Sequence, residues 1–203
     1  MKKLLLTLAL STAALFTFAQ LPTFGIKAGV NSAKISASQG DISVSTGYLT
    51  SFHAGAFVDF KLGAVSLQPA LYYSGKGGKF DDGDGTVYKT SLYYVQVPVN
   101  IVYHIPAVIG SVYLGAGPYA AFGVSAKDKY TSGGQTVSQD LSFGDDSEEI
   151  KRTDFGINGI AGFQFKGGFL VGLNYDLGLS NISNSSMAST KNRVLGVSVG
   201  FTF

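Results

Sequence analysis

The sequence predicts an all-β fold, namely a single eight-stranded antiparallel up-and-down transmembrane β-barrel with short periplasmic turns and longer extracellular loops. Three observations lead to this prediction. From Phe24 onward, large apolar residues recur at every second position, which is the period of a β-strand. The connections between these segments alternate in length along the chain. Only 14% of the residues are charged, against about 25% in an ordinary soluble domain, and 27 of the 203 residues are glycine.

The first twenty residues differ from the rest of the chain. The segment MKKLLLTLALSTAALFTFAQ begins with two lysines, continues with an apolar run as far as Leu15 and ends in small residues before Gln20. This order is typical of a secretory signal peptide, whereas a membrane-spanning helix would need about 20 apolar residues. We therefore expect residues 1–19 to be removed and residues 20–203 to form one barrel domain. Because the chain has no cysteine, no thiol could carry a lipid after cleavage.

The charge of the mature chain is balanced. Cleavage would remove two of the 15 basic residues, and the remaining 13 equal the 13 acidic ones. A neutral chain gives no support to nucleic acid or another polyanion as the partner, so we expect no nucleic acid. Aromatic residues make up 13% of the sequence, and this abundance beside so few charges indicates contact with lipid.

Four strands are expected in the first half of the chain. Residues 24–35 alternate apolar side chains with glycine, lysine and asparagine, and residues 48–61 do so largely with serine, glycine, histidine and aspartate. Residues 65–76 follow the short connection LGA. Residues 88–103 interleave tyrosine, valine and isoleucine with glutamine, proline and asparagine.

Four more strands are expected at residues 111–127, 153–166, 169–181 and 191–203. The last of these ends on RVLGVSVGFTF, in which every second residue from Leu195 is large and apolar while the residues between are mostly small. No sustained 3.6-residue period follows the leader, so we expect no helix after it.

The connections fall into two kinds. LGA, IPAVIG and KGG are short, whereas four others are long and polar, and most charged residues, Lys76 and Lys191 among them, lie in or beside these. Short turns at one end and long charged loops at the other are typical of barrels that cross the bacterial outer membrane, so we expect that location, with both termini periplasmic. The long connections are residues 36–47, 77–87, 128–152 and 182–190.

A soluble barrel of the lipocalin type would share the eight alternating strands and the secretion signal. Its outer face, however, would need charge to dissolve in water. The less apolar faces here consist mainly of glycine, serine, alanine and asparagine, which suit the inside of a narrow barrel better than a wet surface. We therefore expect the bulky face to contact hydrocarbon, where only a closed ladder satisfies the backbone.

Aromatic residues are expected to form two girdles at the membrane interfaces. One girdle would mark the short-turn ends of the strands and the other the long-loop ends. The first comprises Phe24, Phe60, Tyr103, Tyr113, Phe165, Phe169 and Phe203, and the second Tyr73, Tyr93, Phe122, Phe155 and Tyr175.

Several segments resemble the PorT-type outer-membrane β-barrel family of small eight-stranded barrels. They are LYYVQVPVNIVYHI, YLGAGPYAAFGVSAK, TDFGINGIAGFQF, NYDLGLSNIS and the terminal RVLGVSVGFTF, and the resemblance covers essentially the whole mature chain. It marks a barrel rather than an activity, and implies at most an accessory role in protein secretion or transport. In such barrels the closing phenylalanine is the signal for the assembly machinery, which implies that role for Phe201 and Phe203.

The inward faces are expected to form a polar network, because side chains fill the lumen of an eight-stranded barrel. An ion pair between Lys27 and Asp59 would help to fix the register, and a narrow proton or solute path is the alternative. His104, near a short turn, is expected at the interface. The network would comprise Lys27, His53, Asp59, Gln96, Asn100, Asp154, Asn158, Asn174 and Asp176, beside Tyr119 and Gln164.

Two motifs invite a catalytic or metal-binding interpretation. Ser51, His53 and Asp59 share one face of a strand, but the last two are about 20 Å apart along it and cannot form a relay by themselves. The loop DDGDG, residues 81–85, gathers carboxylates that could bind calcium, although a tyrosine stands where a calcium loop counted from Asp82 needs its glutamate. We expect no catalytic residue and no cofactor, and leave open whether this loop binds a cation.

These observations predict a non-enzymatic outer-membrane protein with a structural or surface-interaction role through loops 36–47, 77–87 and 128–152. The alternatives are an accessory component of secretion or transport and, third, a lipid-modifying enzyme that uses His53. The expected partners are outer-membrane lipids, lipopolysaccharide bridged through the acidic residues of 144–152, the barrel-assembly machinery during insertion, and a protein at the extracellular loops.

Overall fold

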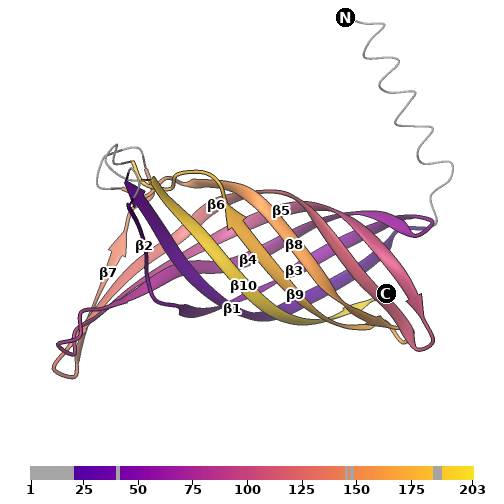
Figure 1. Cartoon of the computed structure of the whole chain (residues 1–203), viewed down its shortest axis with the longest axis horizontal. Helices are drawn as coiled ribbons and strands as arrows, with labels where there is room; N and C mark the ends of the chain where they lie inside the picture. Colours follow the sequence, from indigo (N-terminus) through magenta and orange to yellow (C-terminus); the bar gives the residue numbers. More distant parts are fainter. Residues whose placement is uncertain (1–20, 40–41, 145, 147–148, 185–188) are drawn as a thin grey trace, which may run out of the picture.

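The computed structural model describes residues 21–39, 42–144, 146, 149–184 and 189–203. The expected signal peptide, residues 1–19, lies outside the described residues. Within them, no helix is long and apolar enough to cross a membrane. Ten strands wind into one tilted barrel (Figure 1): β1 (Thr23–Gln39), β2 (Ile42–Ser45), β3 (Leu49–Leu62), β4 (Val65–Asp81), β5 (Val87–Ala107), β6 (Gly110–Ser132), β7 (Gln135–Leu141), β8 (Thr153–Phe165), β9 (Phe169–Gly178) and β10 (Ser189–Thr202).

Eight of these strands close into a ring. Its order is β1, β3, β4, β5, β6, β8, β9 and β10, every pairing is antiparallel, and β10 pairs with β1 again. In the closing pair Gly25 faces Thr202 and Ser38 faces Ser189. Because the ring has no open edge, the ladders satisfy the backbone without water. The prediction of an eight-stranded up-and-down barrel is confirmed.

The two additional strands lie in regions that were expected to be loops. β2 pairs with the end of β1 and β7 pairs with the end of β6, while β4 and β5 continue together as far as Asp81 and Val87. The expectation of loops over 77–87 and 128–152 is therefore wrong over much of their length. The alternation of apolar and polar residues continues there in Phe80, Tyr88 and Tyr130, which supports further strand pairing.

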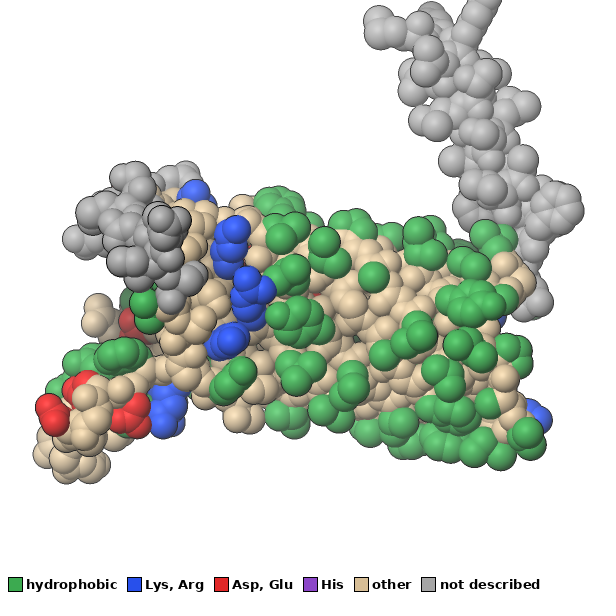
Figure 2. All heavy atoms as spheres, viewed as in Figure 1, with side chains coloured by type: hydrophobic (Ala, Val, Ile, Leu, Met, Phe, Trp, Pro, Cys, Tyr) green, Lys and Arg blue, Asp and Glu red, His purple; other side chains and the backbone are tan. Residues whose placement is uncertain are grey.

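The barrel carries its apolar side chains on the outside. Val199, Ile101 and Leu173 are each more than half exposed, at 52%, 63% and 52%, whereas the side chains of Lys76 and Asp154 are fully enclosed inside. Figure 2 shows the apolar side chains spread over the face of the barrel wall that is in view. This is the inverse of a water-soluble barrel, so the lipocalin alternative is wrong.

The expected girdle residues lie on the outer surface with one exception. Tyr113 is only 4% exposed and points into the lumen, where its hydroxyl donates to the carbonyl oxygen of Val171 at 3.3 Å. Tyr113 and Phe122 are an odd number of positions apart on β6, so they must face opposite sides unless a bulge intervenes. The register shift in the β5–β6 ladder comes only beyond them. The other eleven are Phe24, Phe60, Tyr103, Phe165, Phe169, Phe203, Tyr73, Tyr93, Phe122, Phe155 and Tyr175.

Candidate functional site

The most enclosed charges in the lumen form an ion pair toward the long-loop end. Lys76 Nζ lies 2.9 Å from Asp154 Oδ2, and neither side chain is exposed. The same oxygen accepts hydrogen bonds from the Tyr119 hydroxyl at 3.3 Å and from Asn192 Nδ2 at 3.1 Å, while Oδ1 accepts one from Ser180 at 2.9 Å. Four donors from four other strands or connections thus converge on one carboxylate, which ties opposite walls of the barrel together.

The sequence groups Lys76 with the charges in and beside the long loops, and the predicted lumen network does not include it. Lys76 lies on β4 at the same parity as the buried Ser66, Gln68 and Ser74, so its side chain must point inward. The ammonium lies 4.2 Å from the centre of the Tyr119 ring, a cation–π contact that adds to the ion pair.

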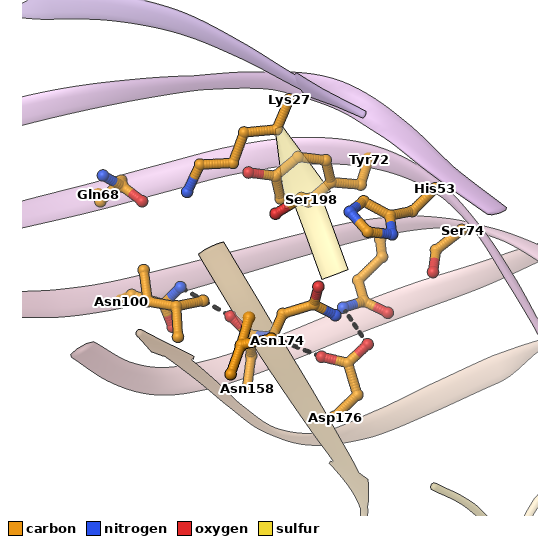
Figure 3. Close-up of a pocket in the computed structure, with 13 residues that line it drawn as sticks. Lys27, His53, Gln68, Tyr72, Ser74, Asn100, Asn158, Asn174, Asp176 and Ser198 are labelled. Carbon is orange, nitrogen blue, oxygen red and sulfur yellow. Dashed lines mark hydrogen bonds between the residues drawn. The ribbon is translucent and has the colours of Figure 1, made fainter. Parts of the chain in front are cut away.

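The middle of the lumen is an amide network around Asp176. Gln96 Nε2 donates to Asp176 Oδ2 at 3.0 Å, and Asn158 Nδ2 donates to Oδ1 at 2.6 Å. Asn100 Nδ2 in turn donates to Asn158 Oδ1 at 2.7 Å. Figure 3 shows Asn100, Asn158 and Asp176 reaching inward from different strands, with Asn158 between the other two. Among the described residues no cation lies within 4.0 Å of the Asp176 carboxylate, and the hydrogen bonds described here come to it from amides.

A small cavity separates this network from Lys27 on the facing wall (Figure 3). Its volume is about 30 Å³, enough for about two water molecules, and Asn174 and His53 also line it. The Lys27 ammonium lies 4.7 Å from the centre of the Phe57 ring and 5.0 Å from that of Tyr113. Two aromatic faces therefore stabilise this cation beside the cavity.

The expected ion pair between Lys27 and Asp59 does not form. Asp59 Oδ2 instead lies 3.5 Å from His104 Nε2, which is also 2.9 Å from the Ser66 hydroxyl. His104 is thus an inward residue, with a side chain only 11% exposed, and the expectation of an interfacial position is wrong. Its parity on β5 matches that of the buried Asn100, which explains the inward direction.

The residues considered for catalysis do not come together. His53 Nδ1 lies 2.7 Å from Asn31 Oδ1, and the Ser51 hydroxyl donates to the carbonyl oxygen of Gly75 at 2.7 Å. Asp59 is engaged with His104, so Ser51, His53 and Asp59 form no relay. Each side chain is held by a different partner, as in a structural network rather than a nucleophilic site.

The acidic loop at residues 81–85 uses its carboxylates locally. Asp82 Oδ1 accepts hydrogen bonds from the backbone N–H groups of Asp84 and Thr86, both at 3.1 Å, and Asp81 Oδ1 accepts one from Gly83 at 3.3 Å. In the described part of the chain, no group of three or more histidines or acidic residues is placed to hold a metal ion.

Beyond the rim of the barrel, β4, β5, β6 and β7 continue as a protruding sheet, residues 78–90 and 128–139 (Figure 1). The face that continues the lumen side carries one row of cross-strand neighbours, and the face that continues the lipid side carries another. The first row, called here the apolar row, is Phe80, Tyr88, Tyr130 and Val137, and the second, the lysine row, is Lys79, Lys89 and Lys129.

The apolar row is open to solvent. Its residues are 55%, 45%, 41% and 64% exposed in strand order, and the rings of Phe80, Tyr88 and Tyr130 lie 6.4 and 5.1 Å apart between neighbours. On the wall of the barrel the outer face is apolar, and above the rim it carries lysine. The membrane boundary therefore lies where the outer face changes from apolar to basic.

The comparisons with known proteins agree with this architecture. A family model described as outer membrane protein beta-barrel domain matches residues 18–184. No curated protein matches the sequence.

Several solved outer-membrane barrels have a similar backbone fold, but their sequence identity to this chain is low. Ail, the attachment invasion locus protein of Yersinia pestis, is 16% identical with a TM-score of 0.46, and covers 91% of this chain and 100% of its own. Neisserial surface protein A is 14% identical with a TM-score of 0.45, covering 89% and 97%. The N-terminal barrel domain of Pseudomonas aeruginosa OprF is 13% identical with a TM-score of 0.39, covering 91% and 99%.

The family match extends over most of the described barrel and includes all ring strands except β10, whose pairing with β1 closes the same ring. The chain therefore belongs to the outer membrane protein beta-barrel domain family and is located in the bacterial outer membrane.

Proposed function

We propose that this outer-membrane protein is a non-enzymatic surface-interaction barrel that binds a protein partner through its protruding sheet. The observation that supports the proposal is the apolar row, whose four members stand side by side on four strands and are all exposed. An exposed apolar row rimmed by polar residues is typical of a protein–protein contact, and aromatic residues are enriched at the centre of such contacts.

The polar surroundings of the row fit the same role. Lys79 lies 3.5 Å from Asp81, and Lys127 lies 3.5 Å from Asp140, and all four side chains are substantially exposed. Such exposed pairs add little stability but set which partners can approach. The connections at 36–47 and 128–152 would contribute the rest of the contact surface.

The alternative of an accessory role in secretion or transport, like that of PorT-type barrels, is supported by the sequence resemblance alone. The lumen offers no support for a channel, because Lys76, Asp154 and the amides around Asp176 occupy it. The enzyme alternative would need a free His53, which is held by Asn31. Membrane lipid around the belt and the assembly machinery at Phe201 and Phe203 remain proposed partners.

The test compares two triple variants that alter opposite faces of the same sheet. One is Phe80→Ser, Tyr88→Ser and Tyr130→Ser, and the matched control is Lys79→Ser, Lys89→Ser and Lys129→Ser. Each tagged barrel is used to capture proteins from the extracellular fraction, and the dissociation constant of the captured protein is then measured for all three barrels. Heat-modified gel mobility verifies folding.

Loss of a central interface aromatic commonly weakens binding by about 2 kcal/mol, so the loss of two such residues should make the first variant bind several hundredfold more weakly. The lysine control should change the dissociation constant by less than about tenfold. A partner whose binding is equally strong with and without the apolar row would contradict the proposal. Binding lost only in the lysine control would indicate a polyanion instead; Ail, for comparison, has been crystallised with the heparin analogue sucrose octasulfate.

A further inference from the structure

Four hydrogen-bond donors form a block on the outer wall where β1 meets β10, at the long-loop end. Lys34 stands directly opposite Arg193, and Ser36 stands directly opposite Lys191. Their neighbours Ala33, Asn192 and Val194 are buried, so the four side chains project from the barrel toward its surroundings. We call these four residues the rim block.

The rim block is short of acceptors. Like charges placed directly opposite on a sheet repel each other, so the pair Lys34 and Arg193 destabilises the ladder unless an anion lies between them. In the described residues every ion pair within 4.0 Å involves other cations, and none includes Lys34, Lys191 or Arg193. The lysine row of the protruding sheet differs, since Asp81 lies 3.5 Å from Lys79.

The height of the rim block on the wall identifies the kind of anion. Leu195, the outward neighbour of Arg193 on β10, is 51% exposed and belongs to the apolar band. Two residues of strand separate their backbones by about 7 Å. The polar headgroup layer of a bilayer extends about 5–8 Å beyond the hydrocarbon on each side, so the block lies at the depth of the headgroup phosphates. Figure 2 shows Lys and Arg side chains in a row at this edge of the apolar band.

The chemistry of the donors fits a phosphate monoester. A guanidinium can bind two phosphate oxygens at once, an ammonium supplies a compact charge, and the Ser36 hydroxyl, 2.9 Å from the Ser45 hydroxyl, adds a neutral donor pair. The Tyr48 ring lies 5.4 Å from the Lys34 ammonium and holds that side chain at the block. We propose that the rim block binds the phosphate group of a phosphorylated lipid in the outer leaflet.

The test compares two double variants with the same change in charge at opposite ends of the barrel. One is Lys34→Gln with Arg193→Gln, and the control is Lys61→Gln with Lys166→Gln at the short-turn end. Full-length mature barrels are folded in detergent and titrated with phosphorylated lipid A, with chemically dephosphorylated lipid A and with inorganic phosphate. Native mass spectrometry counts the bound molecules, and heat-modified gel mobility verifies that each variant is folded.

We expect the wild-type barrel to bind phosphorylated lipid A at least tenfold more tightly than the dephosphorylated lipid, and the rim variant to lose that difference. Each basic residue near an anionic surface contributes a factor of about five, so two together correspond to about 25-fold. The control should change binding by less than about twofold. Equal loss in both variants, or equal binding of both lipids by the wild type, would overturn the proposal. Binding of inorganic phosphate as tight as that of lipid A would assign the block to a free anion and would overturn the lipid assignment.

Discussion

Replacing Asp154 by asparagine should destabilise the barrel by about 3–5 kcal/mol, because it leaves a buried ammonium without its counter-charge. The asparagine keeps the size of the side chain, and its single amide oxygen can still accept the hydrogen bonds from Tyr119 and Asn192 that now end on Oδ2. It removes the negative charge that lies 2.9 Å from Lys76, and neither side chain has contact with solvent that could replace it.

Removing the lysine instead of the aspartate should lower the free energy of unfolding by less. Lys76→Met leaves the Asp154 carboxylate with three hydrogen-bond donors, from Tyr119, Asn192 and Ser180, so we expect a loss of about 1–3 kcal/mol. The double variant has no buried charge at this position and retains the Tyr119 and Asn192 contacts on the amide oxygen, while the Ser180 hydroxyl can still donate to the carbonyl oxygen of Phe155. It should lie within about 1 kcal/mol of the wild type, since a buried pair replaced as a whole is often neutral.

Equilibrium unfolding by urea in lipid vesicles, followed by circular dichroism and by heat-modified gel mobility, measures all four proteins. The slopes of free energy against urea should agree, so that the midpoints report stability alone. A loss below about 1 kcal/mol for Asp154→Asn would refute the reasoning, because it would mean that water reaches this ion pair. A double variant as unstable as Asp154→Asn would also refute it.

Three further outcomes follow from the filled lumen and the ring. In planar bilayers the barrel should show no steady conductance, since the cavity beside Lys27 holds only about two waters; regular stepwise openings would contradict the packing. Tyr113→Ala should cost about 3–5 kcal/mol in urea unfolding by emptying a filled site, whereas the outward Tyr103→Ala should cost clearly less; equal losses would argue against the inward position. Phe203→Ala should slow insertion by the assembly machinery in reconstituted vesicles while the urea midpoint stays within about 0.5 kcal/mol; unchanged insertion would refute a role in the assembly signal.

The two-residue period predicts every ring strand to within a few residues, because each strand meets lipid on one side and other side chains on the other. The same period, followed strictly, also assigns the face of individual residues. Nearness to a turn or to other charges is a weaker guide than parity: His104 and Tyr113 are wrongly assigned on that ground, and Lys76 is left out of the lumen network. All three point inward as parity requires.

The contacts inside the lumen could not be predicted in the same way. Alternation tells which face a side chain occupies, but not which side chains meet across the interior. Asp154 on β8 meets Lys76 from β4 on the far wall and Asn192 from β10. Such meetings depend on strand tilt and on the stagger of the whole ring, which no single strand encodes. The extension of β4 to β7 beyond the rim was hidden because polar residues there look like loop.

Because β1 pairs with β10, the first strand of the ring cannot complete its hydrogen bonding until the last strand has been made. Gly25 finds its partner Thr202 only after nearly all of the intervening chain has been made. Pairings between strands so far apart in the sequence form slowly. Until β1 and β10 pair, both strands present unpaired backbone amides to their surroundings. We therefore expect these borders to need masking by a holding chaperone before insertion, and a chain halted before Ser189 to be degraded rather than inserted.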